Sequence, residues 1–88
     1  MPSPVTIAEL RELIADRTLH RESVALYAQL REDDERNVRT LAARLSRSVP
    51  TILAATDSLI AHGYIRKKRG GGFDFPLAER VNEATSVA

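Results

Sequence analysis

The sequence contains no cysteine, which excludes disulfides and thiolate metal sites and gives no indication of an oxidising compartment. Long apolar runs are missing as well. The longest uncharged run, Ser48 to Thr56, is far shorter than the roughly 20 residues of a membrane-spanning helix. The N-terminal residues also lack the basic and apolar regions of a secretory signal. We therefore expect a cytoplasmic protein that makes no membrane contact.

Recognisable catalytic and cofactor motifs are missing too. The triple glycine at 70–72 is not part of a nucleotide-binding P-loop pattern, and no nucleophile–base motif stands out. His20 and His62 lie far apart in the chain, with no cysteine to complete a zinc site. The acidic run at 32–35 is interpreted as a solvated loop, because adjacent acids on one short segment do not enclose a cation. We predict no enzymatic activity, no metal and no cofactor.

Charge is divided unevenly along the chain. The 88 residues are enough for one domain, and 43% hydrophobic with 28% charged residues is typical of a globular protein. Residues 36–72 hold eight Lys or Arg against one acid, Asp57, and carry +7, whereas five cations and eleven acids leave the remainder at −6. Such a division favours a polyanionic partner on one face. Composition alone does not separate this from a solvated basic face or from complementary patches of a self-associating protein.

Capping patterns predict where the first helices begin. Thr6 and Glu9 form a capping box for a helix from about Ile7 to Asp16. Thr18 is a candidate cap for a second amphipathic helix from Leu19 to about Arg31. A third, short helix has a buried stripe, and its cap is either Asn37 or Thr40. The stripe consists of Val38, Leu41, Ala42 and Leu45.

A polar turn and a fourth helix follow. Ser46-Arg47-Ser48 forms the turn, Ser48 caps the next helix with Pro50 in its first turn, and Gly63 ends that helix. Its inward stripe is Ile52, Ala55, Thr56 and Leu59. Two helices joined by a turn of this length form a helix-turn-helix pattern.

After Gly63 the spacing changes to that of strands. Ile65 precedes four cations and the triple glycine, and Phe73, Phe75 and Leu77 then alternate with Asp74 and Pro76. The pattern predicts a β-hairpin with a basic tip, in which Pro76 lies at an edge or at the end of the strand. Residues 79–88 are expected to form a tail with a short helical turn.

These segments together resemble a winged helix-turn-helix domain of the kind found in MarR-like and related prokaryotic transcriptional regulators. The resemblance covers roughly residues 19–77 and is carried by Thr40–Ile52, Asp57–Ile65 and the basic hairpin. The positions that match the family pattern are Leu41, Ala42, Ser48, Pro50, Thr51, Leu59, Gly63, Tyr64 and Ile65.

The resemblance implies an α+β winged helix-turn-helix fold with three to four helices and a two-stranded wing. The domain organisation is then an N-terminal helix at 1–17, a possible dimerisation arm; the winged helix-turn-helix domain at 18–78; and a C-terminal tail at 79–88. The function implied is a DNA-binding transcriptional regulator, associated with the nucleoid and homodimeric. The helix from Ser48 to His62 enters the major groove, and the wing from Arg66 to Gly72 lies on the backbone or in the minor groove.

Candidate DNA-binding residues are the cations of the +7 segment, the small polar residues of the fourth helix and the glycines of the hairpin. They are Arg36, Arg39, Arg44, Arg47, Ser48, Thr51, Ala54, Ser58, Arg66, Lys67, Lys68, Arg69, Gly70 and Gly71. The chain departs from the family at two points. Arg47 occupies a turn position that is usually aliphatic, and residues 49–61 contain no Arg, Lys, Asn or Gln to contact base edges. Asp57 would face the DNA, where phosphates repel its carboxylate. It therefore needs to pair with a neighbouring cation, such as Arg66 or Lys67, or to accept a hydrogen bond from a cytosine amino group.

A second interpretation remains open. Leu53, Ala54 and Ile60 are expected to face outward, and they form a surface for a protein partner or a second copy of the chain. A winged helix-turn-helix that binds RNA is a third interpretation. Ile7, Leu10 and Ile14 recur at helical spacing and are candidates for the dimer contact.

Overall fold

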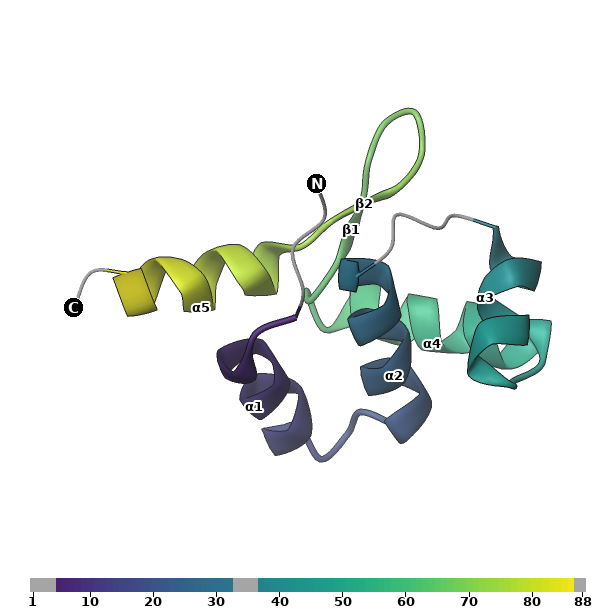
Figure 1. Ribbon diagram of the computed structural model, residues 1–88, viewed down its shortest axis with the longest axis horizontal. Helices are drawn as coiled ribbons and strands as arrows, with labels where there is room; N and C mark the ends of the chain where they lie inside the picture. The colour runs from purple at the N-terminus through teal and green to yellow at the C-terminus, as the bar shows by residue number, and fades with distance from the viewer. Residues whose placement is uncertain (1–4, 33–36, 87–88) are drawn as a thin grey trace.

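The structure is a computed structural model that describes residues 5–32 and 37–86. Within this part of the chain it contains five helices and one two-stranded antiparallel hairpin (Figure 1). The elements are α1 Ile7–Ala15, α2 Arg21–Glu32, α3 Val38–Leu45, α4 Val49–Ala61, β1 Arg66–Lys67, β2 Phe73–Asp74 and α5 Pro76–Ser86. The fold is α+β. None of the helices in the described ranges is long and apolar enough to cross a membrane.

One hydrophobic core joins all the helices. Helix α2 lies in the middle and packs against α1, α3 and α4, while α5 packs against α1 (Figure 1). The largest fully buried side chains are Tyr27, Leu13, Leu26, Ile52, Leu59, Ile65 and Leu77. Burial of each such aliphatic side chain contributes about 1.5–3 kcal/mol relative to exposure. Because these residues come from α1, α2, α4, α5 and the start of the hairpin, the core fixes the hairpin base relative to the helices.

The N-terminus of α1 forms the predicted capping box. The Glu9 backbone N–H donates to Thr6 Oγ1 at 3.2 Å, and the Thr6 N–H donates to the Glu9 carboxylate at 2.6 Å. Glu9 is also fully buried. Its carboxylate accepts from the Tyr27 hydroxyl at 2.7 Å and from Arg31 Nε at 2.7 Å. The cap of α1 is therefore also its polar connection to α2.

Helices α3 and α4 are connected by the polar turn at 46–48. The side chain of Asn37 caps α3, and Ser46 ends it in the left-handed conformation, with φ of 55°. Ser48 then caps α4, and its Oγ accepts from the Thr51 N–H at 3.3 Å. Pro50 lies in the first turn of α4, where no N–H is needed. The predicted caps, turn and Pro50 position are confirmed.

The C-terminal end of α4 is fastened to the loop between α1 and α2. His62 Nε2 lies 2.7 Å from Thr18 Oγ1, and His62 Nδ1 lies 2.7 Å from the Ser58 carbonyl oxygen. Thr18 in turn donates to Asp16, which also accepts from the Tyr64 hydroxyl at 2.7 Å. The prediction that Thr18 caps the second helix is wrong, because α2 begins at Arg21 and Thr18 is engaged by Asp16 and His62 instead.

The hairpin is shorter than predicted, and a helix follows it. Arg66 pairs with Asp74 and Lys67 with Phe73, and the glycines at 70–72 adopt positive φ between 77° and 106°, a region that favours glycine. The alternation from 73 to 77 does not continue as a strand. Pro76 begins α5 instead, since its fixed φ suits the first helical position, and Leu77 becomes buried. The described residues therefore contain five helices where three to four were predicted, and α5 extends through most of the expected tail.

Candidate nucleic-acid interface

Exposed arginines lie along α3 and in the turn that leads from α3 into α4. Arg39 lies on α3, Arg44 in its last turn, and Arg47 in the turn itself, and all three are exposed. Arg47 directly precedes the cap of α4, so its charge lies at the N-terminal end of that helix. The fourth arginine of the prediction, Arg36, lies outside the described residues.

The small polar residues predicted for DNA contact do not share one exposed face. Ser48 is exposed, but its Oγ already caps α4 and lies 2.8 Å from Thr51 Oγ1. Thr51 and Ser58 are half-buried. Together with Ala54 they line a cavity of about 290 Å³ against the N-terminal end of α2, where His20, Glu22 and Ser23 form the opposite wall. This flank of α4 is therefore turned toward α2, and Ala54 lies at its outer edge.

The outermost face of α4 is apolar apart from one acid. Its exposed residues are Pro50, Leu53, Ala54, Asp57 and Ala61, and the Leu53 side chain retains 51% of its accessible surface. These positions recur at intervals of three and four and so lie on one side of the helix. Ile60, which was expected to face outward with Leu53 and Ala54, is half-buried and packs against the core. The surface predicted for a protein partner is therefore reduced to Leu53 and Ala54.

The four cations of the hairpin are not equivalent. Arg66 Nη2 lies 3.7 Å from Asp74 Oδ2, and Lys68 Nζ lies 3.9 Å from Asp74 Oδ1. Asp74, on the strand opposite Arg66, therefore holds both Arg66 and Lys68 within ion-pair distance of its carboxylate. Lys67 and Arg69 are exposed and pair with no acid among the described residues.

The turn of the hairpin is closed by its own backbone. Gly71 N–H donates to the Lys68 carbonyl at 3.2 Å, and Lys68 N–H donates to the Gly72 carbonyl at 3.1 Å. Gly70 and Gly71, the two glycines predicted for DNA contact, are exposed at the tip, and a Cβ added at Gly70 would meet open space. Gly70 is therefore required for its φ of 89° and not to avoid a neighbouring atom of the protein.

A small cavity connects α3, α4 and the hairpin. It has a volume of about 150 Å³, and the two charged residues in its lining are Asp57 of α4 and Lys67 of β1. Leu53 and Phe73 contribute apolar walls. Within the described part of the chain, the Asp57 carboxylate makes no hydrogen bond or ion pair, so the expected pairing with Arg66 or Lys67 is not formed. Arg66 pairs with Asp74 instead.

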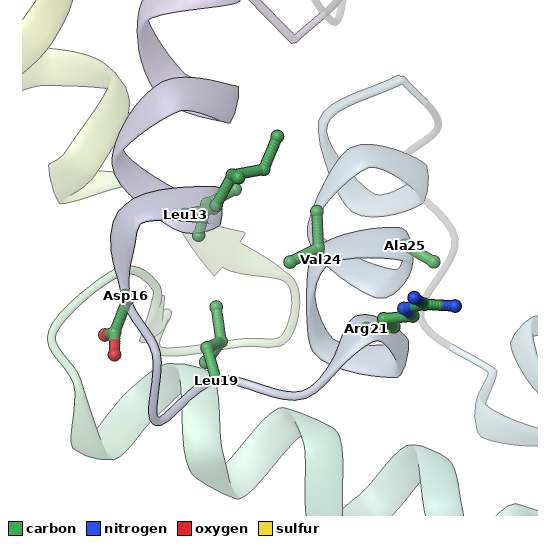
Figure 2. Close-up of a pocket in the computed structure, with 7 residues that line it drawn as sticks. Leu13, Asp16, Leu19, Arg21, Val24 and Ala25 are labelled. Atoms are coloured by element: carbon green, nitrogen blue, oxygen red, sulfur yellow. The ribbon is translucent and has the colours of Figure 1, made fainter.

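A larger cleft lies between α1 and α2, and none of the predicted DNA-binding residues lines it. Figure 2 shows Leu13, Leu19 and Val24 around this cavity of about 420 Å³, with Asp16 and Arg21 at its margins. All three dimer candidates lie on α1: Ile7 and Ile14 are 70% and 71% exposed, while Leu10 is half-buried. Among the described residues, no group of three or more His, Asp or Glu side chains is arranged to hold a metal ion.

Two features of the structure, one at the surface and one buried, were not anticipated from the sequence. Asp74 as the partner of Arg66 and Lys68 follows from the hairpin register, which would have been found by pairing residues outward from the triple glycine. The burial of Glu9 was not foreseeable from its capping role, because it depends on Tyr27 and Arg31 meeting it in space.

Comparison of the chain with protein-family models, with curated proteins and with solved structures gives no match in any of the three. The functional argument therefore depends on the chemistry of the surface itself.

Proposed function

We propose that this chain is a DNA-binding transcriptional regulator with a winged helix-turn-helix fold, acting in the cytoplasm on the nucleoid as a homodimer. In this proposal α3 and α4 are the helix-turn-helix, α4 enters the major groove, and the hairpin is the wing on the backbone or in the minor groove. The observation that carries it is that exposed cations lie on α3, on the turn and on the hairpin, three segments that adjoin α4. These cations are Arg39, Arg44, Arg47, Arg66, Lys67, Lys68 and Arg69.

Charge contact dominates this mode of binding. Each Lys or Arg placed on a phosphate releases a counterion, which gives affinity that depends on salt and little on sequence. Exposed arginines with few competing acids suit this role, because Asp57 is the sole acid between residues 36 and 72. The hairpin glycines allow its backbone to approach a phosphate closely.

The test measures binding to a DNA duplex of random sequence at about 50 mM salt, with fluorescence anisotropy as the readout. A variant with Arg66, Lys67, Lys68 and Arg69 all changed to alanine should bind at least tenfold more weakly. The matched control changes four exposed cations elsewhere to alanine, Arg11, Arg17, Arg21 and Arg80. If binding weakens equally in both variants, the position of the cations does not matter. Binding would then be unspecific charge attraction, and the proposed role of the hairpin would be wrong. Tighter binding of structured RNA than of duplex DNA would favour the RNA interpretation.

The exposure of Leu53 favours a second candidate function, a protein-interaction module. A leucine 51% exposed on a helix face without cations is a suitable contact for a second copy. In this case Leu53→Asp should reduce the molecular mass measured by light scattering and leave the fold intact. If Ile7→Asp with Ile14→Asp reduces the mass instead, α1 is the dimer contact. Unaltered mass in all variants would remove this second candidate.

A further inference from the structure

The exposed side chains of α4 are almost all apolar, and none of them is a hydrogen-bond donor. We define the apolar strip as Pro50, Leu53, Ala54 and Ala61, with Asp57 among them. Four of these five side chains present only carbon, and the fifth presents only acceptor oxygens. The strip therefore contains no hydrogen-bond donor. Of the hydroxyls of α4, those of Thr51 and Ser58 are half-buried on the flank toward α2, and that of Thr56 donates to the Ile52 carbonyl at 2.8 Å.

This inventory matches some base edges and excludes others. In the major groove thymine presents its C5-methyl group, and adenine and cytosine present an amino donor, whereas guanine presents two acceptors. Methyl groups pack favourably against leucine and alanine, and an amino group donates to a carboxylate. Guanine presents only acceptors and so has no group that the strip can use, whereas the acceptors of adenine and thymine are accompanied by an amino donor and a methyl group. An A·T pair offers both features that the strip can use.

We propose that the apolar strip recognises thymine C5-methyl groups in the major groove of A·T-rich duplex DNA, with Leu53 and Ala54 as the specificity-determining residues. This inference rests on the proposed DNA-binding function and adds a base preference to it. Asp57 accepts a hydrogen bond from an adjacent adenine amino group.

The charges around the strip favour DNA over a protein as its occupant. Arg47 lies at the N-terminal end of α4, and Lys67 of the hairpin lines the same small cavity as Asp57 and Leu53. An apolar surface bounded by cations is complementary to a groove whose methyl groups lie between phosphates. A single helix also fits the width of the major groove, about 12 Å.

The decisive experiment compares two A·T-rich duplexes of identical sequence, one with thymine and one with uracil at every thymine position. This replacement removes the C5-methyl group and leaves every base-pairing group in place. We expect the thymine duplex to bind at least fourfold more tightly, because burial of one methyl group corresponds to about a fourfold change. Leu53→Ser should bring the ratio of the two affinities close to one. Ala25→Ser, which places a serine at an exposed position of α2, should leave the ratio unchanged.

The outcomes separate this inference from the proposed function. Equal affinity of the unaltered protein for both duplexes would overturn thymine recognition and leave DNA binding intact. Binding to neither duplex would overturn the proposed function as well. If Leu53→Ser lowers the affinity for both duplexes alike and also lowers the molecular mass, the strip is a contact between copies of the chain and the inference fails. If Leu53→Ser loses the preference for the thymine duplex while its molecular mass stays unchanged, the inference of thymine recognition is supported.

Discussion

Glu9 joins the start of α1 to the middle of α2. Its fully buried carboxylate accepts from the Thr6 N–H, the Tyr27 hydroxyl and Arg31 Nε, and the Arg31 side chain is itself only 11% exposed. The Arg31 guanidinium also lies 5.1 Å above the ring of Phe75, next to the base of the hairpin. One buried carboxylate therefore determines where Arg31 lies, and Arg31 in turn contacts the segment that leads from the hairpin into α5.

Glu9→Gln should lower the free energy of unfolding by about 3 kcal/mol, because it leaves the charge of Arg31 buried without its partner. Urea denaturation measures this loss. Glu12→Gln, an exposed residue on the same helix, is the matched control and should change stability by less than about 0.5 kcal/mol. Equal effects of the two substitutions would show that the buried pair does not stabilise the fold.

Asp16 and Glu9 contribute to the dependence of folding stability on pH. Hydrogen bonds from the Thr18 hydroxyl, the Tyr64 hydroxyl and the Thr18 N–H lower the pKa of Asp16 from 3.8 to about 2. Burial raises the pKa of Glu9. The hydrogen bonds from Arg31, Thr6 and Tyr27 together lower it by more than burial raises it, so the pKa of Glu9 lies below its ordinary value of 4.5. Since both carboxyls have a lowered pKa in the folded state, their stabilisation is present above about pH 4.5 and is lost as the pH falls through their folded pKa values.

Stability measured by urea denaturation should therefore be nearly level from pH 5 to 7 with respect to these carboxyls and should fall between pH 4.5 and pH 2. In Asp16→Asn the fall should be shallower, since one of the two carboxyls no longer titrates. The difference between the two proteins should be larger at pH 6 than at pH 2. Parallel curves across this whole range would contradict the role given to Asp16.

At the scale of the element, the hairpin carries both the cations and an acid that restrains them. Asp74 lies within 4 Å of Arg66 and Lys68, and it opposes Arg66 directly across the two strands. Because these groups are largely exposed, the ion pairs contribute about 0–1 kcal/mol to stability. Their larger consequence, on the proposed function, is that Asp74 weakens the attraction of the hairpin for phosphates.

Asp74→Asn should raise the affinity for duplex DNA about two- to fivefold at about 50 mM salt, because it releases two cations and removes one repulsive charge. The same change of charge at Glu79, on the exposed side of α5, serves as the control and should have a smaller effect. Anisotropy titrations of both variants measure the difference. Weaker binding by Asp74→Asn would mean that Asp74 positions the cations, and that the released side chains no longer reach the DNA.

Elements defined by local chemistry were predictable from the sequence. Thr6, Asn37 and Ser48 each cap a helix through a hydrogen bond within three residues, so the sequence alone locates α1, α3 and α4. The segment after Asp74 was not predictable in this way. Two apolar residues spaced two apart suit a strand, but Leu77 is buried by packing from a helix, and this contact depends on the rest of the fold.

The candidate interface was predictable only in part. Charge density along the chain identifies the arginines and the hairpin, because exposure is the usual state of such side chains. Which side of α4 faces outward depends on how α2 and the hairpin pack against it. For this reason Ile60 is half-buried against expectation, and Thr51 and Ser58 are turned toward α2.

At the scale of the whole molecule, the fold collects the positive charge of residues 36–72 on three neighbouring elements. α3 packs against α4, and the cavity lined by Val38, Asp57 and Lys67 shows that the hairpin adjoins both helices. The acidic remainder of the chain, residues 1–35 and 73–88, supplies α1, α2, β2 and α5. A molecule of nearly neutral net charge thus has a concentrated cationic region, which is the physical basis of the proposed DNA binding.

The most direct test of this account is the salt dependence of binding to duplex DNA, measured from about 50 to 200 mM salt. Seven exposed cations lie on α3, the turn and the hairpin, and contact of about four of them with phosphates predicts a slope of log K against log salt of about −3.6. A slope near zero, or no detectable binding at the lowest salt concentration, would contradict the account.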